Sequence, residues 1–439
     1  MGGVESWQVI GLIYAIALTT LNAGCFTLMI STWCATTVGA FLLTFALGFI
    51  VYFGPMLFID AFDLYEWQSI AIKLNPVGAY VEGYQAGLGE IASSTAVFWV
   101  TSALYFLVAR MVFARRAFLR GENWLRSVFS RLDGLLTRAN RLTGGRTLWR
   151  ARSELPEDRP IRWRELQRRA LDQPHHVLRI SLLLLIPVIA LVVLGALEPG
   201  HRQQQEWLSG LLFVLWGIAA LVVTTLSANL VVVERARQTL DVLLTTPLTT
   251  ASILREKMVP VRRWTWMFTM ALAVVWLAQV WIDRHRTGYA WRREDLDPLV
   301  YITGAFALVW IYLPLISWVS MVFGLRAKTR LRGTITAVTV ITLWQVVPFF
   351  VFILLLFTSG FDDDGASYVL LASPSTFIVF WEFFDDAEEL FNGDVLVPTL
   401  INFVGYGVLL LGVRQWCLRS ADRWLGRARA GAGDQTGGE

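Results

Sequence analysis

The chain has 439 residues, of which 55% are hydrophobic and only 16% are charged. Soluble globular proteins carry about 25% charged residues, so this composition excludes an ordinary soluble domain and indicates a membrane protein. The net charge is only +4, and the three cysteines are too widely spaced for a disulfide framework or a zinc site.

Long apolar stretches follow one another along the chain. A helix needs about 20 mostly apolar residues to cross a bilayer, and roughly nine stretches meet this condition. In chain order they are residues 7–30, 37–58, 95–114, 178–197, 208–230, 264–283, 298–323, 333–358 and 395–414. The predicted fold class is therefore all-α, a polytopic helical bundle with about nine transmembrane helices.

The distribution of arginines predicts which side of the membrane each loop occupies. Arginines are dense in residues 110–179, and the positive-inside rule places such a segment in the cytoplasm. Alternation of the spans then places residues 231–263 in the cytoplasm and the acidic residues 362–389 outside. Residues 284–293 carry arginines on the outer side, against the rule. The preference for arginine over lysine suggests a bacterium, so we expect a multi-pass protein of the bacterial inner (cell) membrane.

Several kinds of chemistry find no support in the sequence. A phosphate-binding P-loop requires Gly directly before its Lys, whereas Lys73, Lys257 and Lys328 follow an isoleucine, a glutamate and an alanine. The spans contain almost no ionisable side chains, which disfavours a proton- or ion-coupled transporter. His175 and His176 are adjacent and point to different faces of a helix, so no metal site is expected. No catalytic residue is expected either.

Residues 1–118 resemble the C-terminal part of the chain in the order of their features. Each copy reads as a span, a short inner turn, a proline-containing span, an outer segment, a final span and arginines. The corresponding residues are Thr36 and Thr329, Pro55 and Pro348, Pro76 and Pro374, and Arg116 and Arg414. Both copies have the same orientation, so this is a parallel repeat, unlike the inverted repeats of many secondary transporters. Chance similarity between two apolar stretches is the alternative.

Residues 231–257 form a charged segment between two spans, broken by a proline. Leu240, Leu243 and Leu244 have helical spacing and form a narrow apolar stripe. Pro247 ends that helix because it restricts the residue before it, and a threonine at 249 or 250 can cap a second helix. The pattern predicts a short helix, a tight turn and a second helix outside the bilayer. An ordinary solvated loop is the alternative.

This segment resembles the inner loop of ABC transporter type-2 permeases. In that family the loop typically reads Glu-x-x-x-Gly-Thr-Leu-x-x-Leu-Leu-x-Thr-Pro-Leu-Ser, continues into a short helix ending near a Lys, and docks on the nucleotide-binding subunit. This chain departs from the pattern at Gln238, where Gly is common, and at Glu256, where Gly often precedes the Lys. By this resemblance the residues expected to couple to an ATPase are Glu234, Arg237, Thr239, Leu240, Leu243, Leu244, Thr246, Pro247 and Leu248.

A second resemblance to the family lies upstream. Residues 159–166 resemble the amphipathic elbow helix that precedes the first span of these permeases. Trp163 and Leu166 would lie in the membrane interface while the arginines face lipid headgroups. A generic basic helix beside the membrane is the alternative. The expected elbow residues are Trp163, Arg164, Glu165 and Leu166.

The resemblance implies a division of the chain into four segments. They are residues 1–118, a partial permease repeat with three transmembrane helices; 119–159, a basic cytoplasmic linker with an interfacial helix; 160–424, a complete six-helix type-2 permease unit; and 425–439, a disordered cytoplasmic tail. A disordered tether is the alternative for the linker.

The implied function is that of the membrane-spanning permease subunit of an ATP-binding-cassette export system. ATP and Mg²⁺ would bind to a separate ABC ATPase subunit, so this chain is expected to bind no cofactor and to be no enzyme. The expected partners are that ATPase, the lipid bilayer and a second permease chain, with no nucleic acid. The first copy lacks an upstream half, which motivates the alternative of a degenerate permease acting as a membrane scaffold or assembly protein.

Overall fold

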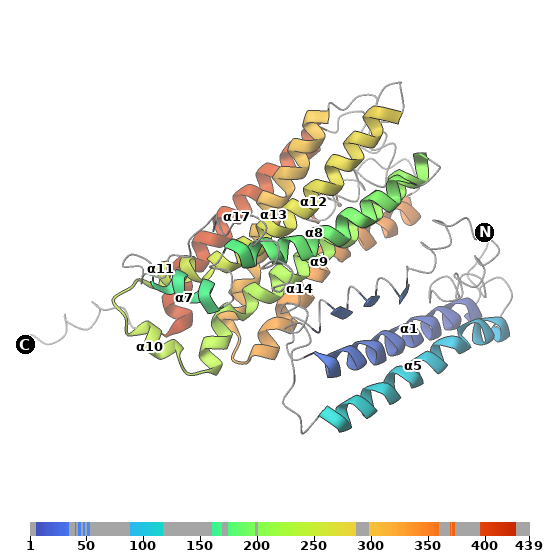
Figure 1. The fold of residues 1–439 in the computed structure, drawn as a ribbon, viewed down its shortest axis with the longest axis horizontal. Coiled ribbons are helices and arrows are strands. Elements are labelled where there is room, and N and C mark those ends of the chain that lie inside the picture. The colour runs from blue at the N-terminus through green and yellow to red at the C-terminus, as the bar shows by residue number, and fades with distance from the viewer. Residues whose placement is uncertain are drawn as a thin grey trace, which may run out of the picture. The chain divides into compact units, whose positions relative to one another are not determined.

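The computed structural model describes most of the long apolar stretches, and every regular element in the described residues is an α-helix (Figure 1). The described residues are 6–34, 88–116, 160–168, 174–197, 201–286, 298–359, 371–373 and 396–426, with 40, 43–44, 47–48, 51–52 and 369. The predicted all-α fold class is confirmed for this part of the chain. The chain divides into two compact units, residues 1–148 and 149–439.

The first unit contains two long helices, α1 (Ser6–Trp33) and α5 (Leu88–Arg116), which pack along each other. Their outward faces carry apolar side chains that are more than half exposed, such as Ile13, Val100 and Phe113. Contiguous exposed apolar surface of this kind is unfavourable in water. These helices are therefore suited to lipid surroundings.

A buried asparagine fixes how α1 and α5 pair. Asn22 is 1% exposed, and its amide nitrogen donates to the Phe98 carbonyl (3.2 Å) and to the hydroxyls of Thr101 (2.8 Å) and Ser102 (2.9 Å). The Tyr52 hydroxyl donates to the side-chain oxygen of Asn22. A buried amide needs such partners, and hydrogen bonds between membrane helices are worth about 1–2 kcal/mol at most. The network selects one register of α1 against α5.

The second unit is built around two central helices. Its long helices are α8 (Pro174–Ala196), α9 (His201–Ala236), α12 (Val259–Arg286), α13 (Pro298–Arg326), α14 (Arg330–Ser359) and α17 (Leu396–Leu425), and its short helices are α7 (Pro160–Arg168), α10 (Leu240–Leu244) and α11 (Thr250–Lys257). The central helix α9 packs against α8, α12, α13 and α14, and the second central helix, α13, also packs against α12, α14 and α17.

Small residues allow the two central helices to approach closely. Ala219, Ala220 and Ala228 of α9 are buried. A Cβ atom added at Gly324 of α13 would lie 2.3 Å from the carbonyl oxygen of Ala228, closer than real Cβ contacts. Membrane helices associate through such small residues because lipid supplies no hydrophobic driving force between them. Glycine at 324 is therefore required by the α9–α13 contact.

The helices identify a multi-pass membrane protein. Six described segments are long and apolar enough to cross a membrane: residues 13–33, 95–115, 207–236, 250–282, 309–326 and 400–425. The predicted spans 178–197 and 333–358 are also helical, as α8 and α14. Most of the predicted span 37–58 lies outside the described residues, so the number nine stays a prediction. The predicted linker 119–159 and nearly all of the tail 425–439 also lie outside them.

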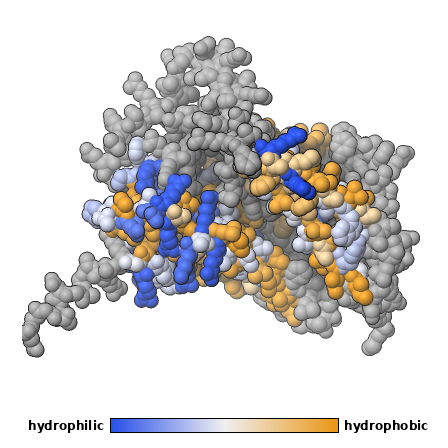
Figure 2. All heavy atoms as spheres, turned by 90° about the horizontal axis from the view of Figure 1, so that it is seen from below, coloured by the Kyte–Doolittle hydropathy of each residue, from blue (hydrophilic) through white to orange (hydrophobic). Residues whose placement is uncertain are grey.

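Polar side chains gather at one end of the second unit. Figure 1 shows α7, α10 and α11 at the same end, where α9 and α13 finish and α12 and α14 begin. Hydrophilic side chains cluster over this part of the surface in Figure 2, and most of the described side chains beyond it are apolar. We call this the polar end of the second unit. The segment predicted to lie outside the bilayer is part of it.

Candidate coupling site

The site begins where α9 ends. The Thr239 amide donates to the Glu234 carbonyl (3.0 Å), and the Gln238 amide donates to the Arg235 carbonyl (3.1 Å). This pair of bonds is the Schellman motif, which closes a helix through a residue in the left-handed conformation. That residue is Gln238, with φ of +57°, the only positive φ of a non-glycine residue in the described chain. The departure from glycine noted in the sequence thus falls where glycine is most favourable.

The next residues form the predicted helix, turn and helix. Helix α10 is a short turn of five residues, and the chain then bends before α11. Thr249 has an extended backbone, and its hydroxyl oxygen accepts from the Ser252 amide (3.3 Å). An N-cap of this type satisfies one of the free amides at a helix start. The prediction of two short helices around Pro247 is confirmed, and Thr249 is the cap.

The leucine stripe of α10 faces the interior of the unit. Leu243 forms a buried cluster with Ile161 of α7 and Ile253 of α11, and Leu248 packs against this cluster. Leu240 is also buried. The stripe therefore holds α10 against α7 and α11. It does not project toward solvent, because these helices offer apolar partners within the chain.

A charged cluster lies beneath the turn and joins three helices. The Lys257 side chain is 1% exposed, and its ammonium nitrogen lies 2.9 Å from Glu165 Oε1 and 3.4 Å from Glu234 Oε1. Arg164 Nη2 lies 3.2 Å from the same Glu234 oxygen and 3.7 Å from Glu165 Oε1. The Thr239 hydroxyl donates to the second carboxylate oxygen of Glu234.

The cluster contains two cations and two carboxylates, and only the Arg164 side chain, 39% exposed, reaches solvent. Glu234 belongs to α9, Glu165 to α7 and Lys257 to α11. Removing one partner of such a buried pair costs much more than the pair itself contributes, because the remaining charge stays in poor solvent. The cluster therefore fixes α7 and α11 to the end of α9.

The elbow helix α7 packs on protein. Leu166 is buried against Met267, with Val259 and Trp264 beside it, while Trp163 is half-buried. The interpretation of Leu166 as a membrane-interface residue is wrong. The physical reason is that α12 supplies an apolar surface directly beside the apolar face of α7.

The polar residues of the elbow helix also differ from expectation. Glu165 is buried against Lys257, and Arg164 contacts Glu234 instead of lipid headgroups. The backbone amide of Arg162 donates to Glu256 Oε2 (3.2 Å), so a side chain of α11 caps the first turn of α7. Glu256, the glutamate that stands where glycine often precedes the lysine, thus serves to cap α7.

The residues predicted to couple to an ATPase fall into three groups by exposure. Arg237 and Pro247 are exposed; Thr239, Leu244, Thr246 and Leu248 are half-buried; Glu234, Leu240 and Leu243 are buried. The buried and half-buried residues hold the segment in shape. The surface available to another protein includes Asp241, Val242 and Thr245, which were not among the predicted coupling residues. Helical spacing places these side chains opposite the leucine stripe.

We call this surface the α10 outer face. It comprises Arg237, Asp241, Val242, Thr245 and Pro247, all exposed. Val242 is 69% exposed and is the aliphatic side chain of this face. The face thus combines an apolar centre with a cation and a carboxylate at its edge, as protein interfaces do.

The end of α9 is also tied to α13 and α14. Arg235 donates to the carbonyls of Ala327 (2.5 Å) and Leu325 (3.3 Å), which satisfies the free carbonyls at the end of α13. Asn229 donates to the Thr334 hydroxyl (3.0 Å) and accepts from Arg330 Nε (3.0 Å), both in α14. These bonds fix the end of α9 to α13 and α14 as well as to α7 and α11.

The described residues contain no group of three His, Cys, Asp or Glu side chains that could hold a metal ion. No protein-family model and no curated protein matches the chain.

Proposed function

We propose that the chain is the membrane-spanning permease subunit of an ATP-binding-cassette export system, driven by a separate ATPase subunit. The observation that carries the proposal is the α10 outer face. It is an exposed patch with an apolar centre on a short helix whose other side is fixed to the membrane helices through buried contacts. The resemblance of residues 234–248 to the type-2 permease loop gives the class of partner.

The buried contacts explain how a push on α10 would reach the spans. A force on Val242 passes through Leu243 to Ile161 and Ile253, which lie on α7 and α11. The Lys257–Glu234 pair then passes it to α9. Because packed interiors are stiff, such a contact chain moves as a body and does not deform continuously. Rigid-body rocking of one group of helices against another is the movement that alternating access requires.

The proposal places the polar end of the second unit in the cytoplasm of a bacterium, and the spans in its inner membrane. The arginine-rich loops support this orientation through the positive-inside rule. The ATPase partner would supply ATP and Mg²⁺, and this chain would supply the pathway and the docking surface. A second permease chain would complete the pathway.

The substitution Val242→Asp tests the docking surface. It places a carboxylate at the apolar centre of the α10 outer face, so ATPase binding should weaken by about 30-fold, the loss typical of an interface hot spot worth 2 kcal/mol. Co-purification of the ATPase with tagged protein from the native host measures this. Because Val242 is exposed, the fold should be unchanged.

Leu331→Asp is the matched control. Leu331 is 71% exposed, also aliphatic and also at the polar end, at the start of α14. The ATPase should co-purify with this variant as with the unaltered chain. If both variants lose the partner equally, the α10 outer face is not the docking site. If no ATPase ever co-purifies with the unaltered chain, the export function itself is wrong.

A further inference from the structure

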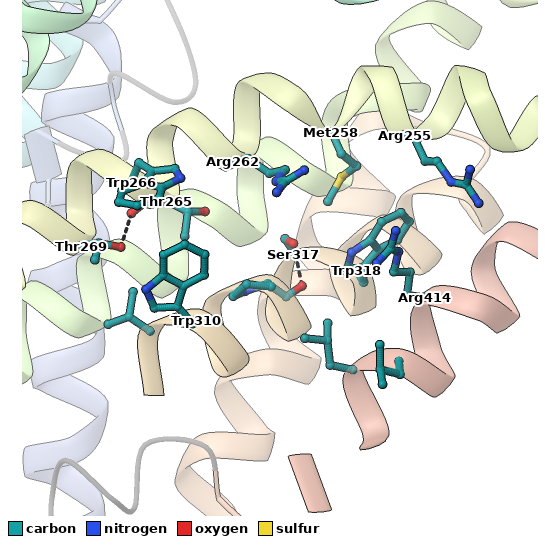
Figure 3. Close-up of a pocket in the computed structure, with 14 residues that line it drawn as sticks. Arg255, Met258, Arg262, Thr265, Trp266, Thr269, Trp310, Ser317, Trp318 and Arg414 are labelled. Carbon is teal, nitrogen blue, oxygen red and sulfur yellow. Dashed lines mark hydrogen bonds between the residues drawn. The ribbon is translucent and has the colours of Figure 1, made fainter. Parts of the chain in front are cut away.

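A cavity of about 410 Å³ lies between α12, α13 and α17, with the end of α11 at one side. This volume is within the range of roughly 300–1,000 Å³ found for small-molecule sites. Its lining divides into two parts, as Figure 3 shows. Arg255, Arg262 and Arg414 lie toward the α11 side, whereas Trp266 and Trp310 lie at the opposite side.

The cationic part has no counter-charge among the described residues. Arg255 belongs to α11, Arg262 to α12 and Arg414 to α17, and all three are exposed. None of them has a described carboxylate within 4.0 Å, in contrast to the paired Arg164 at the same end of the unit. Three guanidinium groups from three helices thus line one cavity. Guanidinium groups bind phosphate through paired, charge-assisted hydrogen bonds.

The apolar part is exposed at the surface of the helices. Trp266 and Trp310 pack edge to face with ring centroids 4.9 Å apart, and both are about half exposed. Leu411 of α17 is also exposed at the cavity, whereas Met258 and Trp318 close its inner wall. Trp266, Trp310 and Leu411 belong to candidate membrane spans, so their exposed surfaces are suited to contact with lipid chains. Tryptophan is typical of the boundary between headgroups and chains.

We infer that this cavity binds an anionic phospholipid. Its phosphate contacts Arg255, Arg262 and Arg414, and the start of an acyl chain lies against Trp266 and Trp310. Basic pockets between membrane helices bind anionic headgroups in this way. A soluble anion would satisfy the arginines but would make no apolar contact with the exposed tryptophans. The lipid would bridge α17 and α11, the helix that follows Pro247.

The inference stands apart from the proposed export function, because it concerns binding alone. The test uses the purified full-length chain, stripped of lipid in a non-ionic detergent, and native mass spectrometry with added phosphatidylglycerol or phosphatidylcholine. Phosphatidylglycerol should bind at least about tenfold more tightly, since each arginine near a headgroup contributes on the order of 1 kcal/mol. Equal retention of the two lipids would overturn the inference.

The triple substitution R255Q/R262Q/R414Q should abolish the preference for phosphatidylglycerol. The matched control is R332Q/R419Q/R423Q, which removes the same charge from exposed arginines that do not line the cavity. The control should keep the full preference. Equal losses in the two triple variants would show a general surface attraction and overturn the site.

A third variant keeps all the charges and tests the apolar part. Trp310→Ala removes one tryptophan of the cavity, from α13, and Trp281→Ala removes a similarly exposed tryptophan of α12 that does not line the cavity. Only Trp310→Ala should weaken phosphatidylglycerol binding, by several fold. Inorganic phosphate at equal concentration should displace little of the lipid. Full displacement, or an unchanged Trp310→Ala variant, would identify a soluble-anion site and contradict the lipid assignment.

Discussion

Each of the two units of this protein contains a buried polar cluster that joins its helices, and the two clusters differ in charge. In the first unit the neutral amide of Asn22 joins α1 to α5. In the second unit Lys257, Glu165 and Glu234 join α11, α7 and α9. The neutral network lies within two apolar helices, whereas the charged one lies at a polar end. The first suits helix pairing in lipid, and the second suits a rigid attachment that would transmit force.

The comparison also bears on the proposed repeat. Helix α1 packs along α5 in the first unit, and their suggested counterparts α13 and α17 pack along each other in the second. The α13–α17 pair uses aromatic contacts, including Tyr312 and Tyr406 with ring centroids 4.7 Å apart, and Arg326 above two tryptophans of α17. Similar pairing with different contacts agrees with a repeat, which stays a prediction.

The largest effect is expected from breaking the charged cluster. Lys257→Met leaves Glu165 and Glu234 close together and buried, with only the partly exposed Arg164 as a cation beside them. The free energy of unfolding should fall by about 3–5 kcal/mol, as for other buried pairs that lose one partner. SDS-titration unfolding in mixed micelles measures this. The control Lys328→Met removes an exposed lysine and should change stability by less than about 0.5 kcal/mol. Equal effects would show that the cluster is not structural.

A smaller effect is expected from breaking the neutral network. Asn22→Ala removes the hydrogen bonds to Phe98, Thr101 and Ser102 and should lower stability by about 1–2 kcal/mol, the range for polar contacts between membrane helices. The same unfolding assay applies. Thr27→Ala is the control, because its exposed hydroxyl donates only within α1, to the Ala23 carbonyl. A loss with Asn22→Ala as large as that with Lys257→Met would remove the contrast between the two clusters.

The smallest effect has the opposite sign. Gln238→Gly should stabilise the chain by about 0.5–1 kcal/mol, because glycine adopts the left-handed conformation at no steric cost. Arg237→Gly, one residue earlier and without a positive φ, should destabilise by a similar amount. Thermal unfolding of both variants in detergent gives the sign. Stabilisation by both would mean that the end of α9 is not fixed as described.

Local features of the sequence predicted much of the fold. The span predicted at 298–323 is the helix Pro298–Arg326, and that at 333–358 is Arg330–Ser359. The helix pair around Pro247 and its threonine cap were also predictable. Each of these follows from apolar length or from interactions between near neighbours in the chain.

Contacts between distant residues could not be read from the sequence. Glu165 and Lys257 are 92 positions apart, and Arg162 and Glu256 are 94 apart. The sequence shows that positions 165 and 256 are glutamates. It does not show that α7 packs against α11 and brings them to their partners. The same limit explains Leu166, whose apolar partner in α12 is distant in sequence. The exposure of Val242 was predictable from local sequence, since helical spacing places it opposite the leucine stripe.

The most direct test of the central claim is photocrosslinking from position 242 in membranes of the native host. A photoreactive amino acid at Val242 should form an adduct with an ABC ATPase, and the same residue at Leu331 should not. An adduct at 242 with lipid alone, or labelling of a cysteine at 242 only from the outer side of the membrane, would contradict the account.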